Sequence, residues 1–494
     1  MRARAPRALA VALVGAVAAI VPTLAAAPAL GHPSGASVSS RRDTVAAWYW
    51  SSRRVVMPPG VREIVERAYM AGGSVPSFSR QTGLPCSACH YQFPQLTPFG
   101  RLFKLNGYSI VGLKRITEPD IKKGAPLALL PIPPLAAMFQ TSLTHLGKER
   151  PGTQNDNVAF PQQFSLFLGG SISPHFGTLL QATYSGASGS FGIDNTDIRY
   201  ANRINLATKN LIYGLTLHNN PTVQDVWNTT PAWGFPFASS QITPPPIAGS
   251  VIDGQLAQGV LGIGAYALWN NLVYVEATGY RSAPQGALQT DTTAVNAIHG
   301  VTPYWRAALE HQFGSTYGMI GTYGLSAHQF PSGVAGPTDA FTDAAVDAQI
   351  EHPIRDGGVV ILRWTTIHER QSLTALFTEP TPASANLHNT LNTTRVNASF
   401  EPNARYEATL GYFATTGTRD SVLYAPGVLT GSRTGRPSTN GLIEELDLNF
   451  WQNTRLAIQG TEFANFNGAA RSYDGFDRQA WNNNTLYVLL WIAF

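Results

Sequence analysis

The residues best suited to chemistry are two cysteines and a histidine near the beginning of the chain. Cys86 and Cys89 are the only cysteines in 494 residues, and His90 follows directly. A disulfide across so small a loop stabilises little, a zinc site needs four ligands, and a thioredoxin-like CxxC belongs to a βαβ unit. The C-x-x-C-H spacing is instead the attachment pattern of c-type haem. We therefore expect one covalent haem c on the two thiols, with His90 as proximal iron ligand.

The beginning of the chain predicts export. Three arginines precede an apolar run over residues 8–24, and small residues follow over 25–31. This order describes a secretory signal peptide, covering residues 1–31. A membrane anchor is the alternative, but the run is short for a bilayer span and is interrupted by Pro22.

The haem motif lies in a segment that is too small to enclose a haem by itself. We expect a flexible periplasmic leader over 32–72 and a monohaem cytochrome c segment over 73–134. The recognisable haem-like stretch covers only about residues 73–112, and chains below roughly 40 residues seldom bury a core unaided. The remainder of the chain must therefore enclose the haem.

Residues 135–494 have the pattern of a membrane β-barrel. Apolar and polar residues alternate with period two, as in half-buried strands, and no further run is long enough for a transmembrane helix. Seven short turns alternate with longer polar stretches rich in Gly, Pro, Ser, Thr and Asn, which is typical of outer-membrane barrels. The turns are at 173–177, 206–210, 270–271, 313–315, 352–358, 401–404 and 451–454. Seven turns and the two closing strands predict an all-β, transmembrane antiparallel barrel of about sixteen strands.

The last strand supports a bacterial outer-membrane location. In TLYVLLWIAF, residues 485–494, alternate positions from Leu486 to Phe494 form one apolar face, and the chain stops on an aromatic residue. A soluble sandwich or propeller is the alternative, but soluble folds rarely end on such an exposed apolar strand. Charged residues make up only 13% of the chain, and no pattern suggests a nucleic-acid partner. We expect the outer surface of the barrel to contact membrane lipid.

The alternation also sorts the ionisable residues between lipid and lumen. Asp343, Asp347, Gln349 and Glu351 point to one side of their strand, and charge on the lipid side is costly. We expect these residues and Arg363 to line the lumen and to pair there, as a structural network or, alternatively, for ion or electron traffic.

The same parity argument selects a sixth iron ligand. Met138 shares the predicted lumen face of the strand near 135–145 and lies close in sequence to the haem motif. Met319 shares its face with Tyr317 and Tyr323, which we assign to lipid. Met57 and Met70 fall in the leader. We favour Met138 as the axial ligand opposite His90, with ordinary lumen packing as the alternative.

Three stretches resemble the monohaem outer-membrane cytochrome–porin fusions, a family that includes iron oxidases of iron-oxidising bacteria. They are PSFSRQTGLPCSACHYQFPQLTPFGRLFKLNGY (76–108), PLAAMFQTSLTH (134–145) and NNPTVQDVWNTTPAWGFPF (219–237). The resemblance implies a haem-bearing plug inside a sixteen-stranded porin. It also implies electron transfer from extracellular Fe(II) to a periplasmic carrier. Some members carry methionine at the position of Phe99. This chain can therefore differ from those iron oxidases in its redox potential and its electron donor.

Two other functions remain open from the sequence. In the first, the chain is a solute-diffusion porin whose haem segment gates the channel or acts as a sensor. In the second, it is an electron conduit that oxidises a donor other than iron. Electron transfer at a haem needs no acid–base residues, so we assign no catalytic side chains. From its length and its Pro and Trp content, we also expect the stretch 219–237 to fold inward over the haem, with a surface loop as the alternative.

Overall fold

The structure is a computed structural model that describes residues 76–109, 116–117, 128–129, 134–206, 208–282, 297–331 and 336–494. These residues belong to one compact unit, Arg42–Phe494. The predicted signal peptide (1–31) and leader (32–72), including Met57 and Met70, lie outside the described residues.

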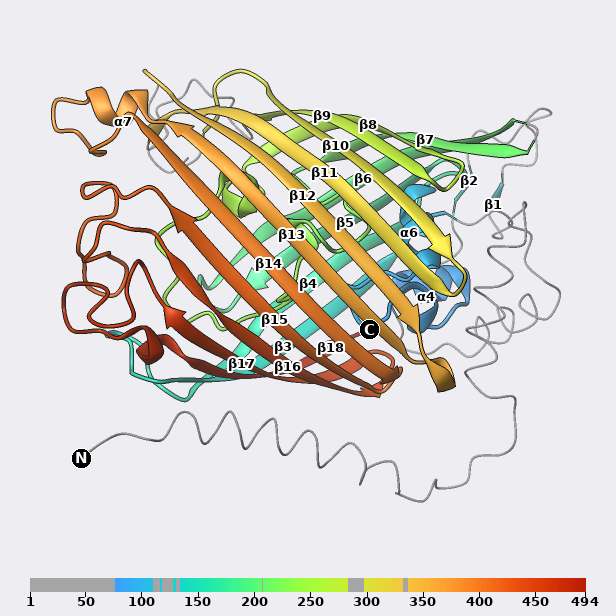
Figure 1. Cartoon of the computed structure of the whole chain (residues 1–494). Helices are drawn as coiled ribbons and strands as arrows, with labels where there is room; N and C mark the ends of the chain where they lie inside the picture. Colours follow the sequence, from blue (N-terminus) through green and yellow to red (C-terminus); the bar gives the residue numbers. More distant parts are fainter. Residues whose placement is uncertain are drawn as a thin grey trace. The chain divides into compact units, whose positions relative to one another are not determined.

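Sixteen antiparallel strands close into a barrel, as predicted (Figure 1). The first barrel strand, β3, pairs with the last, β18, from Met138↔Ala493 to Leu146↔Thr485, so the barrel has no free edge. The strands are β3 (Leu135–Leu146), β4 (Asn157–Ser171), β5 (Phe176–Ser185), β6 (Ser190–Leu206), β7 (Lys209–His218), β8 (Val260–Trp269), β9 (Val273–Ser282), β10 (Thr302–Phe313), β11 (Thr316–Gln329), β12 (Asp339–Pro353), β13 (Val359–Ser372), β14 (His388–Asn403), β15 (Tyr406–Gly417), β16 (Thr439–Trp451), β17 (Thr454–Asn465) and β18 (Thr485–Ala493).

The connections differ at the two ends of the barrel. All seven predicted short turns join consecutive strands at one end, toward the right of Figure 1. The long connections lie at the other end, with α7 (Thr374–Thr378) and η5 (Ala480–Asn483). One short turn contains η4 (Arg355–Gly357). In outer-membrane barrels short turns face the periplasm and long loops face outward, which gives the chain its orientation.

The two faces of the barrel wall are chemically distinct. On β18 the outward residues Leu486 and Phe494 are exposed, whereas Tyr487 and Leu489 face inward and are buried. Most inward positions on β12 are acidic or amidic, as the alternation predicted, with Ala345 among them, and outward Val346 is exposed. A closed barrel with an apolar exterior and all strand edges paired is suited to a bilayer. The chain is a bacterial outer-membrane protein.

One face assignment from the sequence is wrong. Met319 was expected to face lipid with Tyr317 and Tyr323, but all three side chains are buried inside the barrel. The outward residue of this part of β11 is Ile320, which is 56% exposed. Both faces of β11 are largely apolar, because the inward face packs against other segments of the chain, and alternation alone cannot distinguish them.

The N-terminal described segment lies against inward-facing barrel residues. It contains α4 (Ser77–Thr82), α5 (Cys86–Cys89) and α6 (Pro98–Leu105). Thr97 is the N-cap of helix α6, and its side chain accepts a hydrogen bond from the Gly100 N–H at 3.1 Å. Pro98 occupies the first helical position, where a proline is favoured. We call residues 76–109 the plug. Two short paired strands follow, β1 (Ile116–Thr117) and β2 (Ala128–Leu129).

A second segment also enters the lumen. Residues 219–259, which we call the inner loop, connect β7 to β8 and contain η1 (Pro231–Trp233) and η2 (Val251–Gln255). Every residue from 220 to 230 is buried. The predicted inward folding of 219–237 is therefore confirmed. No helix in the described part of the chain is long and apolar enough to cross a bilayer.

The outward assignment of β11 can be tested by placing a charge on it. We expect Ile320→Arg, four residues inside the short-turn end of the strand, to lower the free energy of unfolding in lipid by about 2–4 kcal/mol. Phe313→Arg, at the short-turn end of β10, is the matched control and should cost about 0–1 kcal/mol. Denaturant titration of the barrel in vesicles measures both, and equal costs would contradict the assignment.

Candidate functional site

The cysteines and histidine of the motif lie on a single turn of the plug. Helix α5 spans Cys86–Cys89, and the His90 N–H donates to the Cys86 carbonyl at 2.9 Å. Both thiols are unpaired, so they do not form the disulfide considered from the sequence. The turn brings two thiols and an imidazole together, as thioether attachment and axial ligation require.

The protonation states of these groups follow from their burial. Burial, followed by the neighbouring Cys86, raises the pKa of the Cys89 thiol to about 12. Burial lowers the pKa of His90 to about 4. The imidazole is therefore neutral at physiological pH, which is the form that ligates a metal. Its Nδ1 is buried without a hydrogen-bond partner among the described residues.

The motif lies at the short-turn end of the barrel. The Cys86 N–H donates to Gln452 Oε1 at 3.0 Å, and Gln452 belongs to the turn between β16 and β17. The Arg80 guanidinium donates to the carbonyl of Leu135, the first residue of β3. At the far end of the plug, Ser109 Oγ lies 3.4 Å from the carbonyl oxygen of Pro174 in another short turn. The motif is thus at the periplasmic end of the lumen.

An aromatic wall connects the motif to β18 and β3. The Phe93 ring lies 5.4 Å from the His90 ring and stacks on Trp491 at a centroid distance of 5.2 Å. Trp491 belongs to a buried cluster that includes Met138. Met138 is 3% exposed on the lumen face, as predicted, and its sulfur lies 3.6 Å from Gln140 Nε2. The structure thus places Met138 on the wall that Phe93 contacts.

These residues fit a c-type haem. Two free thiols and a neutral histidine with an unpartnered buried nitrogen form the donor set, beside an apolar aromatic wall. Cys86 and Cys89 would hold the group, His90 would ligate it, and Met138 is the candidate for the other axial position. Among the described residues, no group of three or more His, Cys, Asp or Glu side chains is arranged to hold a metal ion by itself.

A buried ion pair between Arg101 and Glu351 fastens the plug to the barrel. The sequence pattern indicated Glu351 but not Arg101. Arg101 of α6 donates to Glu351 of β12 through two contacts, 2.5 and 3.2 Å long. The Tyr91 hydroxyl donates to the same carboxylate at 3.0 Å, and the Arg101 guanidinium lies 4.2 Å from the centre of the Tyr317 ring. Glu351 was predicted to face the lumen, but periodicity could not reveal its partner in a distant helix.

The predicted pairing of the lumen acids with Arg363 is not what the structure shows. Arg363 does face the lumen, but its guanidinium donates to Gln95 of the plug at 2.9 Å. Asp347 pairs with Arg306 at 2.6 Å. The prediction failed because Gln95 belongs to the plug and Arg306 to β10. The alternation within β12 and β13 carries no information about partners on other segments.

The other end of the plug is fixed by polar contacts to a different wall. The Tyr108 hydroxyl donates to Asp197 of β6 at 2.6 Å, and Asp197 also pairs with Arg199 at 2.8 Å. The Tyr266 hydroxyl of β8 donates to the Leu105 carbonyl at 2.5 Å. The plug is therefore bonded to opposing sides of the barrel.

The inner loop holds the plug from the long-loop side. Lys104 Nζ donates to the carbonyls of Val223 and Asp225, at 2.6 and 2.8 Å, and the Leu96 N–H donates to Asn228 Oδ1 at 3.0 Å. Burial lowers the pKa of Lys104 to about 7. The plug and the inner loop are therefore in direct contact.

Comparison with known proteins supplies no family. No protein-family model and no curated protein matches the chain. Similar solved structures include a loop-deletion mutant of OmpT from Vibrio cholerae (9% identity, 73% of this chain and 98% of that chain, TM-score 0.39). Another is the channel DcaP of Acinetobacter baumannii, with 10% identity over 73% of this chain and 96% of the DcaP chain and a TM-score of 0.44. A third is OmpF of Salmonella typhi in complex with daunomycin, with 11% identity over 73% of this chain and 97% of the OmpF chain and a TM-score of 0.38.

Removing one partner of the plug ion pair should loosen the plug. Glu351→Ala leaves Arg101 buried and unpaired, which typically costs about 3–5 kcal/mol. We expect trypsin to cleave after Arg101 in this variant and not in the wild type. Replacing both partners by methionine should restore much of the protection, whereas Glu149→Ala, in an exposed loop, should change nothing. Equal cleavage of the wild type and the Glu351→Ala variant would contradict this role.

Proposed function

We propose that the chain is an outer-membrane electron conduit that carries a covalent c-type haem in the barrel lumen. In this proposal it passes electrons from extracellular Fe(II) to a periplasmic carrier. The observation that carries the proposal is the turn Cys86–His90, with two free thiols and a neutral, half-buried imidazole, fastened inside an outer-membrane barrel. The choice of Fe(II) rests on the resemblance of 76–108 and 219–237 to iron-oxidising cytochrome porins.

Each part of the site has a role that follows from its chemistry. When bound, the haem supplies one-electron redox chemistry, and Cys86 and Cys89 hold it at the periplasmic end. His90 and Met138 would ligate its iron, and a thioether ligand favours a higher potential than a second histidine. The stacked rings of Phe93 and Trp491 place an apolar surface on this side.

The position of the motif also supports a periplasmic acceptor. Cys86 contacts the turn at Gln452, so a carrier on the periplasmic side can approach the haem-bearing segment without entering the barrel. The bilayer core, ~30 Å thick, otherwise opposes the movement of charge. The lumen, which the plug and the inner loop occupy, provides a route through protein across it.

The donor is tested by mixing oxidised protein with Fe(II) citrate and following the absorbance of reduced haem. We expect rapid reduction by Fe(II), because electron transfer to the haem needs no further chemistry. The Cys86→Ser/Cys89→Ser variant, which cannot attach haem, is the control and should give no signal. Reduction by sulfite or sulfide but not by Fe(II) would assign a different donor, and no reduction by any of them would overturn the conduit.

The sixth ligand is tested with two inward-facing methionines. We expect Met138→Ala to abolish the sulfur-to-iron charge-transfer band of the oxidised haem and to lower the midpoint potential. Met319→Ala, which removes a buried lumen methionine from a cluster that includes Leu105 of the plug, should leave the band intact. A band that survives in Met138→Ala would assign the position to another residue.

A further inference from the structure

We propose that the inner loop, residues 219–259, is a partition that closes the barrel to solutes. Sixteen-stranded porins ordinarily leave an aqueous channel. Here the inner loop contacts the wall around the lumen, so that the barrel acts as a sealed scaffold. This inference concerns permeability and does not depend on haem or on electron transfer.

The loop first crosses to the wall formed by β10, β11 and β12. Asp225 lies 3.5 Å from Arg306, and both side chains are completely buried. The Trp227 indole N–H donates to Glu310 at 3.2 Å and to the Tyr317 hydroxyl at 2.7 Å. These contacts hold the buried stretch 220–230 against β10 and β11.

The loop then reaches the opposite wall. Gln459 of β17 donates to the Ala238 carbonyl at 3.0 Å, and Gln241 donates to the Gln162 carbonyl of β4 at 3.3 Å. The Thr243 hydroxyl lies 2.9 Å from the Thr485 hydroxyl of β18. The chain has therefore passed from one side of the lumen to the other within about twenty residues.

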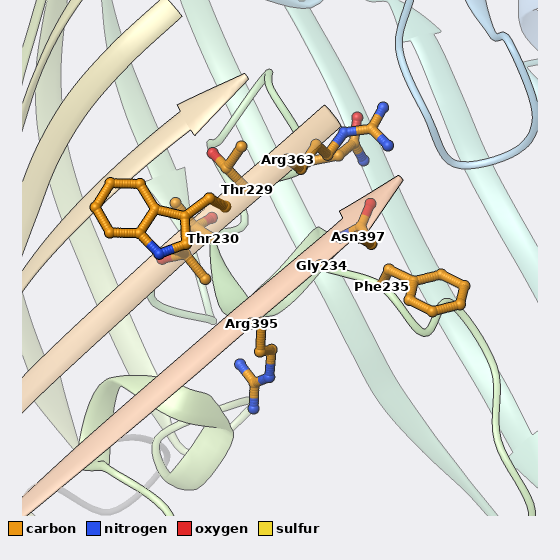
Figure 2. Close-up of a pocket in the computed structure, with 10 residues that line it drawn as sticks. Thr229, Thr230, Gly234, Phe235, Arg363, Arg395 and Asn397 are labelled. Carbon is orange, nitrogen blue, oxygen red and sulfur yellow. The ribbon is translucent and has the colours of Figure 1, made fainter. Parts of the chain in front are cut away.

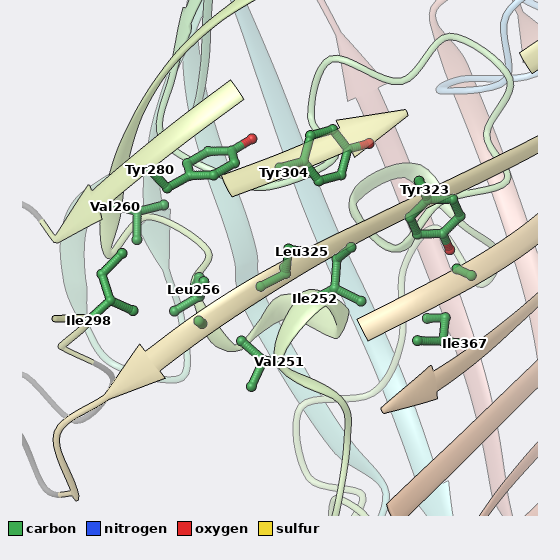
Figure 3. Packing of buried hydrophobic residues seen from close by; sticks show 12 residues of the cluster. Val251, Ile252, Leu256, Val260, Tyr280, Ile298, Tyr304, Tyr323, Leu325 and Ile367 are labelled. Atoms are coloured by element: carbon green, nitrogen blue, oxygen red, sulfur yellow. The ribbon is translucent and has the colours of Figure 1, made fainter. Parts of the chain in front are cut away.

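The last part of the loop returns to β12, β13 and β14. The backbone N–H groups of Val251 and Ile252 donate to Glu369 and Asp343 at 2.6 and 2.8 Å. Asp253 forms an ion pair with Arg395. Figure 3 shows Val251, Ile252 and Leu256 packed among inward-facing residues of β9, β11 and β13. The partition is thus anchored at both ends and in the middle.

The burial of lumen charges supports closure. Arg199, Arg306 and Arg363 are at most 1% exposed, and Asp347 and Glu369 are fully buried. In a water-filled channel such side chains would be hydrated, because burying a charge is costly. Buried lumen-facing side chains occur on every barrel strand, from Met138 on β3 to Trp491 on β18.

One cavity between the partition and the wall is small. Figure 2 shows the cavity where residues 228–235 face β13 and β14, with Arg363 and Arg395 projecting from those strands. Its volume is ≈ 10 Å³, about the room that one water molecule needs. This gap does not provide a route for solutes.

Single-channel conductance of the purified holoprotein in planar bilayers tests the partition. We expect no porin-sized steps from the wild type. Replacing residues 221–257 by a four-residue Gly-Ser linker should raise the mean conductance at least tenfold. Deleting residues 378–382, an exposed part of the β13–β14 connection, is the matched control and should leave the membrane silent. A heat-dependent shift in gel mobility checks that each barrel is folded.

Two results would overturn the partition: porin-sized steps from the wild type, or a folded 221–257 replacement that remains silent. If the replacement does not fold, Asp343→Ala/Glu369→Ala removes the acceptors of the η2 backbone. Swelling of liposomes that contain this variant should then exceed that of wild-type liposomes, and equal swelling would refute the proposal. Haem reduction is measured separately, so failure of the conduit and failure of the partition are distinguishable.

Discussion

The volume enclosed by a closed sixteen-stranded wall is the constraint on which the remaining structure depends. Side chains of the wall alone leave such a lumen filled with water. Here two segments of the same chain, 76–109 and 219–259, occupy it and contact each other. Polar groups that they bury need partners inside the barrel. Most of the interior contacts described above satisfy that requirement. A few side-chain atoms, such as both amide atoms of Gln92 and Oε1 of Gln224, are buried without a partner among the described residues.

The charged contacts show how the requirement is met. Arg101 on the plug meets Glu351 on the wall, and Arg306 on the wall meets Asp225 on the inner loop. Each pair joins an inserted segment to a strand, so each also fixes the position of that segment. The turn Cys86–His90, held in this way, has a fixed environment on the periplasmic side, which an isolated segment of this size could not provide.

Much of the fold could be predicted because the barrel wall is locally encoded. Alternation and turns such as Asn270-Asn271 gave the number of strands, and the lumen face of Met138 followed from its neighbours. Met319 was misassigned because β11 is apolar on both faces. Contacts such as Arg363 to Gln95 and Arg101 to Glu351 join residues more than 200 positions apart. Composition and periodicity contain no signal for such pairs, although the Pro- and Trp-rich stretch 219–237 did indicate inward folding.

The central claim is that the turn Cys86–His90 carries a covalent haem in the assembled barrel. Mass spectrometry of the tryptic peptide 81–101, from protein extracted from outer membranes and denatured before digestion, tests it most directly. The account predicts that this peptide carries one haem through two thioether bonds, in a one-to-one ratio with the chain. An unmodified peptide, or one in which Cys86 and Cys89 form a disulfide, would contradict it.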